Sequence, residues 1–198
     1  MSTLPVAIPA IETPWTLPSR GRVGMFSLIA TESAIFTIFV VAYIFYIGKS
    51  LSGPTPQQVL QLPIFNSICL LSSSLTIHLA VSGLRREKSG AFNLFWFLTL
   101  ALGTIFLVGT GREWYHLIYH KGLTISTNLF GTTYYSLVGL HAFHVTAGLV
   151  GLSVVMILAL AGAVKQEHTQ RVDVLSLYWH FVDVVWVVVF TVVYIVGK

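Results

Sequence analysis

The chain has 198 residues, of which 55% are hydrophobic and only 9% are charged, and its formal net charge is +4. A soluble globular domain carries about 25% charged residues, so this composition excludes an ordinary soluble domain and predicts an integral membrane protein. The single cysteine, Cys69, excludes an intrachain disulfide, and its place in an apolar run indicates a small packing residue.

The first 22 residues contain four prolines and have no apolar core after a basic start. They therefore do not have the pattern of a cleavable signal peptide. We expect residues 1–22 to form an extended arm along the membrane surface or a partner. Residues 23–198 then form one transmembrane domain.

Five runs with few or no charges follow, each long enough to cross a bilayer, which takes about 20 apolar residues in a helix. They predict an all-α integral membrane protein, a bundle of five transmembrane helices. The fourth run exceeds one hydrocarbon core, so its helix should tilt or project beyond the bilayer. The runs are Val23–Gly48, Ile64–Leu84, Ala91–Gly111, Phe130–Val164 and Val174–Val196.

The basic residues predict the orientation of the bundle, because lysine and arginine favour the cytoplasmic side of a membrane. A cytoplasmic N-terminus and an external C-terminus leave seven basic residues inside and four outside. The net charge then needs no nucleic-acid partner. The seven are Arg20, Arg22, Arg85, Arg86, Lys88, Lys165 and Arg171, and the four are Lys49, Arg112, Lys121 and Lys198.

Six ionisable residues lie inside the runs, where such side chains are costly and mark a site or a buried pairing. A rise of about 1.5 Å per residue places Glu32 and Asp183 roughly 15 Å from the cytoplasmic end. His78 and His180 lie about 10 Å from that end. These four could meet if their helices are neighbours. The six are Glu32, His78, His141, His144, His180 and Asp183, and Glu113 follows at the outer end of the third run.

Two spacings bring polar side chains onto shared helix faces. His180 and Asp183 are three residues apart within YWHFVDVVWVVVF, so they share one face of the last helix. His141 and His144 have the same spacing within GLHAFHVTAG. Gly148, another turn along, lets a second helix approach closely.

Three functional interpretations and one structural interpretation compete for these residues. A bis-histidine haem site needs two facing imidazoles, a non-haem metal site needs several converging ligands, and a proton relay would use Glu32 with histidine or aspartate neighbours. Hydrogen bonds between helices would instead fix the bundle, at about 0.6 kcal/mol each. We favour interhelical bonding for the histidines and Asp183, and Glu32 stays open between a site and packing.

A further pair, His116 and His120 in REWYHLIYHKG, has a spacing that can bind a metal on a helix. No third ligand is near in the sequence. Trp114, Tyr115 and Tyr119 surround the pair and fit an aromatic belt. We therefore favour anchoring at the membrane interface for this segment.

Taken together, six segments resemble subunit III of the haem–copper oxidases over about residues 22–198. YWHFVDVVWVVVF (178–190) is similar to that family's last-helix signature almost residue for residue, and GLHAFHVTAGL (139–149) resembles its penultimate helix. The resemblance is to the five-helix bacterial form, which lacks two N-terminal helices. Thr110 and Trp114 depart from the family's glutamine and tyrosine around Glu113. The other segments are TESAIFTIF (31–39), PIFNSICLLSSSLTIHLA (63–80), LGTIFLVGTGREW (102–114) and FGTTYY (130–135).

The resemblance implies an accessory subunit of a respiratory terminal oxidase, in a bacterial inner (plasma) membrane. Cytochrome c oxidase is favoured over quinol oxidase. The subunit would stabilise catalytic subunit I, bind phospholipid and support proton uptake while oxygen is reduced to water. Haem and copper would lie in partner subunits, so this chain is expected to hold no redox centre, catalytic residue or metal ligand. Expected partners are subunit I, subunit II, other small subunits and phospholipid, with membership of a respiratory supercomplex left open.

The resemblance also divides the polar residues into two groups. Those expected at a lipid-binding or intramembrane polar site are Glu32, His78, His180 and Asp183, and those expected to pack helices together are Glu113, His141 and His144. Two alternatives stay open. One is the five-helix accessory protein of a nitric oxide reductase system, and the other is a self-contained haem-binding or proton-conducting membrane protein.

Overall fold

The computed structural model describes residues 19–197, and five of its helices are long and apolar enough to cross a membrane. No strand occurs within residues 19–197. The predicted all-α fold with five transmembrane helices is therefore confirmed. The five are α1 (Arg20–Tyr46), α3 (Ile64–Arg85), α4 (Ser89–Tyr119), α5 (Leu129–Leu160) and α6 (Thr169–Phe190), and the shorter elements are α2 (Pro56–Val59), the 3-10 turn η1 (Gln166–His168) and η2 (Thr191–Val196), a π-helix that continues α6.

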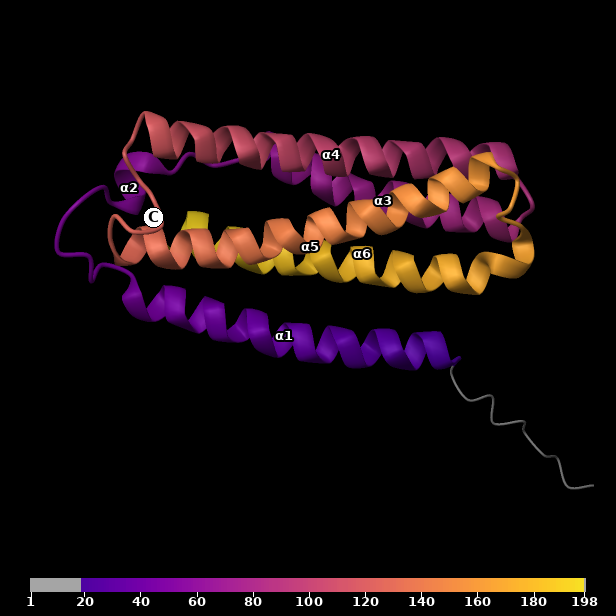
Figure 1. The fold of residues 1–198 in the computed structure, drawn as a ribbon, viewed down its shortest axis with the longest axis horizontal. Helices are drawn as coiled ribbons and strands as arrows, with labels where there is room; N and C mark the ends of the chain where they lie inside the picture. The colour runs from indigo at the N-terminus through magenta and orange to yellow at the C-terminus, as the bar shows by residue number, and fades with distance from the viewer. Residues whose placement is uncertain (1–18, 198) are drawn as a thin grey trace, which may run out of the picture.

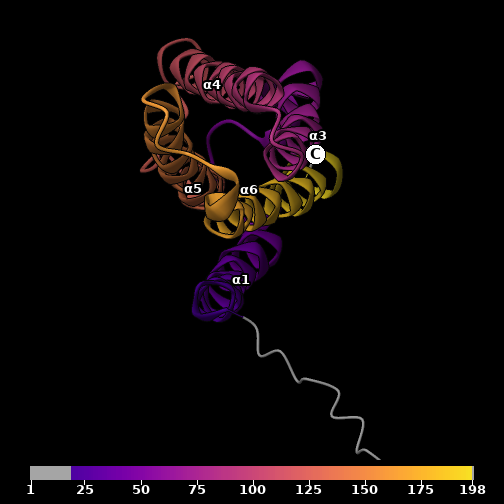
Figure 2. The same cartoon turned by 90° about the vertical axis from the view of Figure 1, so that its right-hand side faces the viewer.

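Four of the long helices enclose the core, and the fifth lies outside them. Helices α3, α4, α5 and α6 form a four-helix ring in which each helix packs against two neighbours (Figure 2). Helix α1 packs on the outside of this ring, against α5 and α6 (Figures 1 and 2). Only Phe36 and Tyr43 of α1 are buried. The three tryptophans among the bulkiest fully buried side chains, Trp96, Trp179 and Trp186, all belong to the ring.

One aspartate joins three helices at one end of the bundle, which we call the Asp173 end. The carboxylate of Asp173 on α6 accepts hydrogen bonds from the guanidinium groups of Arg22 on α1 and Arg85 on α3. Gln166 of η1 adds a bond of 3.0 Å from its amide to the Arg85 carbonyl oxygen. The loop before α6 is thereby tied to the end of α3.

Two helices extend beyond their predicted bounds, in both cases where a charged residue had been taken as the limit of the apolar run. Helix α4 continues past Gly111 to Tyr119, because charged residues such as Arg112 and Glu113 are good helix formers. Likewise α6 already begins at Thr169 rather than at Val174.

Helix α5 ends at Leu160, before the predicted Val164. Gly162 has a φ of 72°, and its N–H and that of Ala163 bond back to the carbonyl oxygens of Ala159 and Leu158. This is the Schellman motif, in which a left-handed glycine ends a helix.

The predicted N-terminal arm lies mostly outside the described residues. Residues 1–18 are not described, whereas Arg20–Arg22 already belong to α1. Ser19 precedes the helix, and its hydroxyl accepts a hydrogen bond from the backbone N–H of Arg22. A serine at this position is a common helix N-cap, so α1 starts before the predicted boundary at Val23.

Candidate functional site: polar clusters inside the bundle

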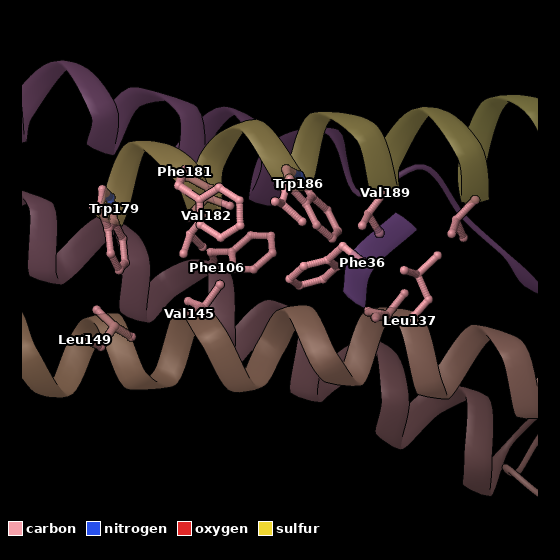
Figure 3. Close-up of a cluster of buried hydrophobic side chains, with 14 of the residues drawn as sticks. Phe36, Phe106, Leu137, Val145, Leu149, Trp179, Phe181, Val182, Trp186 and Val189 are labelled. Atoms are coloured by element: carbon pink, nitrogen blue, oxygen red, sulfur yellow. The ribbon is translucent and has the colours of Figure 1, made fainter. Parts of the chain in front are cut away.

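Trp179 of α6 contacts every other helix of the four-helix ring. Its indole N–H donates a 2.8 Å hydrogen bond to the hydroxyl of Ser73 on α3. Its ring lies against Gly103 of α4 and Gly148 of α5, where an added Cβ would come within 2.8 Å of ring carbons. Figure 3 shows Trp179 and Trp186 on the α6 side of the core, facing α5. The close helix approach predicted at Gly148 is therefore made by the ring of Trp179.

A run of serines on α3 supplies the hydrogen-bonding partners of α6. Besides the bond from Trp179 to Ser73, the Trp186 indole N–H donates to the Ser67 hydroxyl at 3.0 Å. The two helices are antiparallel, so the later tryptophan on α6 meets the earlier serine on α3. The two tryptophan–serine pairs therefore lie at different depths along one interface. Serine in a transmembrane helix both allows close packing and accepts such bonds.

Ser74 joins the two polar residues of the last-helix signature. Its hydroxyl lies 3.0 Å from Nδ1 of His180 and donates to Oδ2 of Asp183. A hydroxyl has one proton, so Ser74 can only accept from His180, whose Nδ1 must carry the proton. Asp183 is 3% exposed, and within residues 19–197 its Oδ1 has no hydrogen-bond partner. The predicted shared face exists, but the link between the two side chains comes from α3.

Glu32 of α1 is paired with His144 of α5. Oε2 of Glu32 lies 3.1 Å from Nε2 of His144, whose Nδ1 lies 2.8 Å from the carbonyl oxygen of Leu140. Since that carbonyl only accepts, Nδ1 carries a proton. One further proton then lies between Glu32 and Nε2, either on the carboxyl group or on an imidazolium ring. The pair holds a shared proton in both forms.

The Glu32 side chain is 24% exposed, whereas the His144 side chain is 8% exposed. The backbone carbonyl of His144 also accepts a 3.1 Å bond from the hydroxyl of Tyr178 on α6. His144 therefore links α1, α5 and α6. Together with the ion pair between Arg22 and Asp173, this contact attaches the outer helix to the ring.

The four residues that could meet if their helices were neighbours are divided between two interfaces. His180 and Asp183 lie between α3 and α6, while Glu32 lies between α1 and α5. His78 is exposed on α3, one turn beyond Ser74. Equal depth therefore does not bring all four together, because depth does not fix the direction in which a side chain leaves its helix.

His141 differs from His144 although both lie on α5. It is 1% exposed, and its ring stacks on Trp186 with centroids 5.0 Å apart and lies edge-on to Phe106 at 5.9 Å. Neither ring nitrogen has a hydrogen-bond partner in the described part of the chain. Phe36 of α1 contacts both histidine rings, with centroids 6.5 and 5.1 Å away. His141 is thus packed among aromatic rings.

Glu113 connects the far ends of three elements. Its Oε1 accepts hydrogen bonds from the hydroxyls of Tyr194 at 3.0 Å and Tyr134 at 3.4 Å. These tyrosines come from η2 and α5, whereas Glu113 belongs to α4. Glu113 was expected to pack helices together, but neither tyrosine was predicted as its partner. The hydroxyl groups of these tyrosines, which lie within apolar runs, were the sequence signal that could have identified them as partners of Glu113.

The histidine pair near this end has its two rings in contact. His116 and His120 are both exposed, with ring centroids 5.1 Å apart. Among residues 19–197, no three histidine, cysteine, aspartate or glutamate side chains are grouped as ligands for a metal ion. The pair has no third ligand of these types beside it.

The family of the chain follows from a match over nearly all of the described bundle. A family model described as cytochrome c oxidase subunit III matches residues 20–198. The chain belongs to the cytochrome c oxidase subunit III family. This confirms the resemblance drawn from the six segments.

Relatives in this family come from both kinds of terminal oxidase. Cytochrome c oxidase subunit 3 of Synechocystis is 38% identical over 182 residues, which cover 90% of this chain and 76% of that protein. The protein of the same name from Alkalihalophilus pseudofirmus is 33% identical, covering 92% of this chain and 90% of that protein. Cytochrome bo(3) ubiquinol oxidase subunit 3 of Pseudomonas aeruginosa is 31% identical, covering 88% and 84%.

Proposed function

We propose that this chain is the accessory subunit III of a respiratory terminal oxidase. The observation that carries the proposal is the family match over residues 20–198, together with relatives named as oxidase subunits. In this proposal haem and copper belong to the catalytic partners, subunits I and II. The chain packs beside subunit I and stabilises it while oxygen is reduced to water.

The geometry of the polar clusters fits a subunit that stabilises a larger partner. Glu32, His144, His180 and Asp183 all contact side chains of neighbouring helices. Hydrogen bonds of this kind fix the relative positions of transmembrane helices. A subunit whose helices are locked in this way offers a rigid surface to a larger partner.

An apolar cleft beside Glu32 supports the lipid-binding part of the proposal. The cleft lies between α1 and α6, has a volume of about 380 Å³, and is lined by residues that include Ile29, Ser33, Phe36 and Val188. Its walls are almost wholly aliphatic and aromatic, which suits an acyl chain. We place bound phospholipid in this cleft, next to the proton shared by Glu32 and His144, where it supports proton uptake by the oxidase.

The cellular setting is also part of the proposal. All basic residues of the predicted inner segments lie at the Asp173 end. They are found at the start of α1, at the end of α3 and in the turn after it, in the α5–α6 loop and at the start of α6. We assign this end to the cytoplasm and the protein to a bacterial plasma membrane. A cysteine placed at Lys88, in a variant with Cys69→Ser, should react with an impermeant thiol reagent only in inverted vesicles. Labelling in intact cells would reverse the assignment.

Co-purification tests the main proposal. The chain is tagged in its own organism, extracted in mild detergent, and its companions are identified by mass spectrometry and by optical spectrum. We expect a haem–copper catalytic subunit in equal amount. A nitric oxide reductase in its place, or a haem spectrum from this chain alone, would contradict the proposal.

The electron donor is tested on the same preparation. We favour cytochrome c, following the relatives with 38% and 33% identity. Oxygen uptake driven by reduced cytochrome c but not by quinol is the expected result. The reverse preference would make the chain a quinol oxidase subunit without changing its family.

A further inference from the structure

A hollow with both polar and apolar walls lies at the opposite end of the bundle from Asp173, between α4 and the start of α3. Its volume is about 240 Å³, and its polar lining consists of Gln61, Asn66, Glu113 and His116. Helix α1, which borders the cleft proposed for the acyl chain, contributes none of its lining. We call this space the Glu113 hollow. It is separate from the site of the proposed function and does not rest on it.

The polar groups of the Glu113 hollow have unused bonding capacity. Both hydrogen bonds to Glu113 end on Oε1, which leaves Oε2 without a protein donor in the described part of the chain. Within the same residues, the side chains of Gln61, Asn66 and His116 make no hydrogen bond. Four polar side chains from two helices and a loop thus line one space without bonding to one another.

The side chain of Asn66 is held in place by its packing in the lining of the Glu113 hollow. Its side-chain amide lies over Gly109 of α4, so closely that a Cβ at residue 109 would overlap both amide atoms. Gly109 therefore gives the Asn66 amide room against α4. The amide of Asn66 is half-buried as a result.

The acceptors of the hollow favour a cation with N–H donors. Glu113 is the only acidic residue near this end of the described bundle, and the amides of Gln61 and Asn66 add two neutral oxygens. A primary ammonium group has three N–H donors and one charge, which matches a carboxylate oxygen and two amide oxygens. A divalent metal ion prefers six or more oxygen ligands with more carboxylates.

The depth of the hollow favours a lipid headgroup as the carrier of that ammonium group. Glu113 lies six residues before the end of α4 at Tyr119, or about 9 Å along the helix axis. Trp114, Tyr115 and Tyr119 follow Glu113 on α4, and aromatic residues of this kind form a belt at headgroup depth. Val59 and Leu62 form an apolar side of the hollow along which the glycerol end of a lipid can lie.

From these observations we infer that the Glu113 hollow binds the primary ammonium headgroup of an aminophospholipid of the phosphatidylethanolamine type. The carboxylate of Glu113 supplies the charge, Asn66 and Gln61 supply neutral acceptors, and Tyr134 and Tyr194 hold the carboxylate in place. A quaternary choline headgroup has no N–H donor and binds more weakly.

Native mass spectrometry of the full-length chain, purified with its companion subunits and stripped of lipid in detergent, tests this inference. The probes are dihexanoyl-phosphatidylethanolamine, dihexanoyl-phosphatidylcholine, free ethanolamine and Mg²⁺. We expect the ethanolamine lipid to bind about tenfold more tightly than the choline lipid, as one lost charge-assisted bond implies. Neither free ethanolamine nor Mg²⁺ should displace it at equal concentration.

Variants separate the site from general lipid binding. Glu113→Gln keeps an oxygen acceptor for the two tyrosines but loses the charge, and it should lower ethanolamine-lipid affinity about tenfold. Gln61→Ala changes an exposed loop residue, cannot unfold the bundle, and should lower that affinity about threefold. Gln57→Ala removes the same kind of side chain from an exposed position outside the hollow, so it is the matched control and should leave that affinity unchanged.

Equal binding of the two lipids overturns the inference, and so does unchanged affinity in both Glu113→Gln and Gln61→Ala. Displacement by free ethanolamine would assign the site to a soluble amine, and displacement by Mg²⁺ to a metal ion; either result refutes the lipid assignment. Loss of the companion subunits without loss of lipid binding would affect the proposed function alone.

Discussion

Replacing Gly148 with alanine is expected to loosen the packing of the four-helix ring at its centre. The added methyl group would lie 2.8 Å from two carbons of the Trp179 indole and 3.3 Å from a ring carbon of Tyr178. Trp179 cannot move away freely, because Gly103 of α4 contacts the same ring and Ser73 of α3 holds its N–H. Either the ring or helix α5 has to shift.

The size of the effect follows from two opposing terms. Forcing an extra methyl group into a packed core costs about 1–3 kcal/mol, while alanine is favoured over glycine in a helix by about 1 kcal/mol. Gly139→Ala on the same helix is the matched control, since its methyl group would meet only Trp114, at an ordinary 3.4 Å. The helix term is common to both variants, so Gly148→Ala should be less stable than Gly139→Ala by about 1–3 kcal/mol.

The measurement is reversible unfolding of the purified chain in detergent by titration with dodecyl sulfate, followed by circular dichroism. The two variants are compared at the same detergent concentration, so that the micelle contributes equally. A difference of less than about 0.5 kcal/mol, the limit of additivity for independent sites, would refute the packing described for Trp179. The helices would then tolerate a wider separation than the structure shows.

Three further substitutions test the polar contacts. Asp183→Ala should lower the free energy of unfolding by about 1–2 kcal/mol because Ser74 loses a buried acceptor, while Asp183→Asn keeps an oxygen and should cost less than half as much; equal losses in the same titration would contradict the bond. Glu32→Ala and His144→Ala should show a coupling of about 0.6–1.7 kcal/mol in a double-mutant cycle, as for other transmembrane hydrogen bonds, and additive effects would exclude the pairing. Asp173→Asn should cost about 1 kcal/mol or less, since its ion pairs are partly exposed, and thermal unfolding should show a smaller loss at high salt.

Hydropathy was sufficient to predict the number of helices but not all of their ends. Length and apolar composition are properties of a single segment, so all five spans could be found without knowing their neighbours. Charge is a weaker guide to where a helix stops. The predicted third run ended at Gly111, before the charged residues Arg112 and Glu113. Both lie inside α4, where the carboxylate of Glu113 is held by Tyr134 and Tyr194.

The partners of the polar residues could be predicted only in part. Spacing correctly placed His180 and Asp183 on one face, because helical geometry alone decides this. The partner of Glu32 could not be predicted in that way, since it depends on which helices are adjacent and how each is rotated. Depth grouped Glu32 with His180, whereas the fold brings it to His144.

The position of α1 outside the ring has a consequence for the order of biosynthesis. Helix α1 is made first, but its partners come late, since His144 follows Glu32 by 112 residues and Asp173 follows Arg22 by 151. A chain that has inserted only α1, α3 and α4 therefore holds Glu32 in the bilayer without its imidazole, at a cost of several kcal/mol for an ionised carboxylate. During this interval the carboxyl group has to remain protonated or be shielded by another membrane protein. The last two helices to leave the ribosome are thus the ones that secure the first.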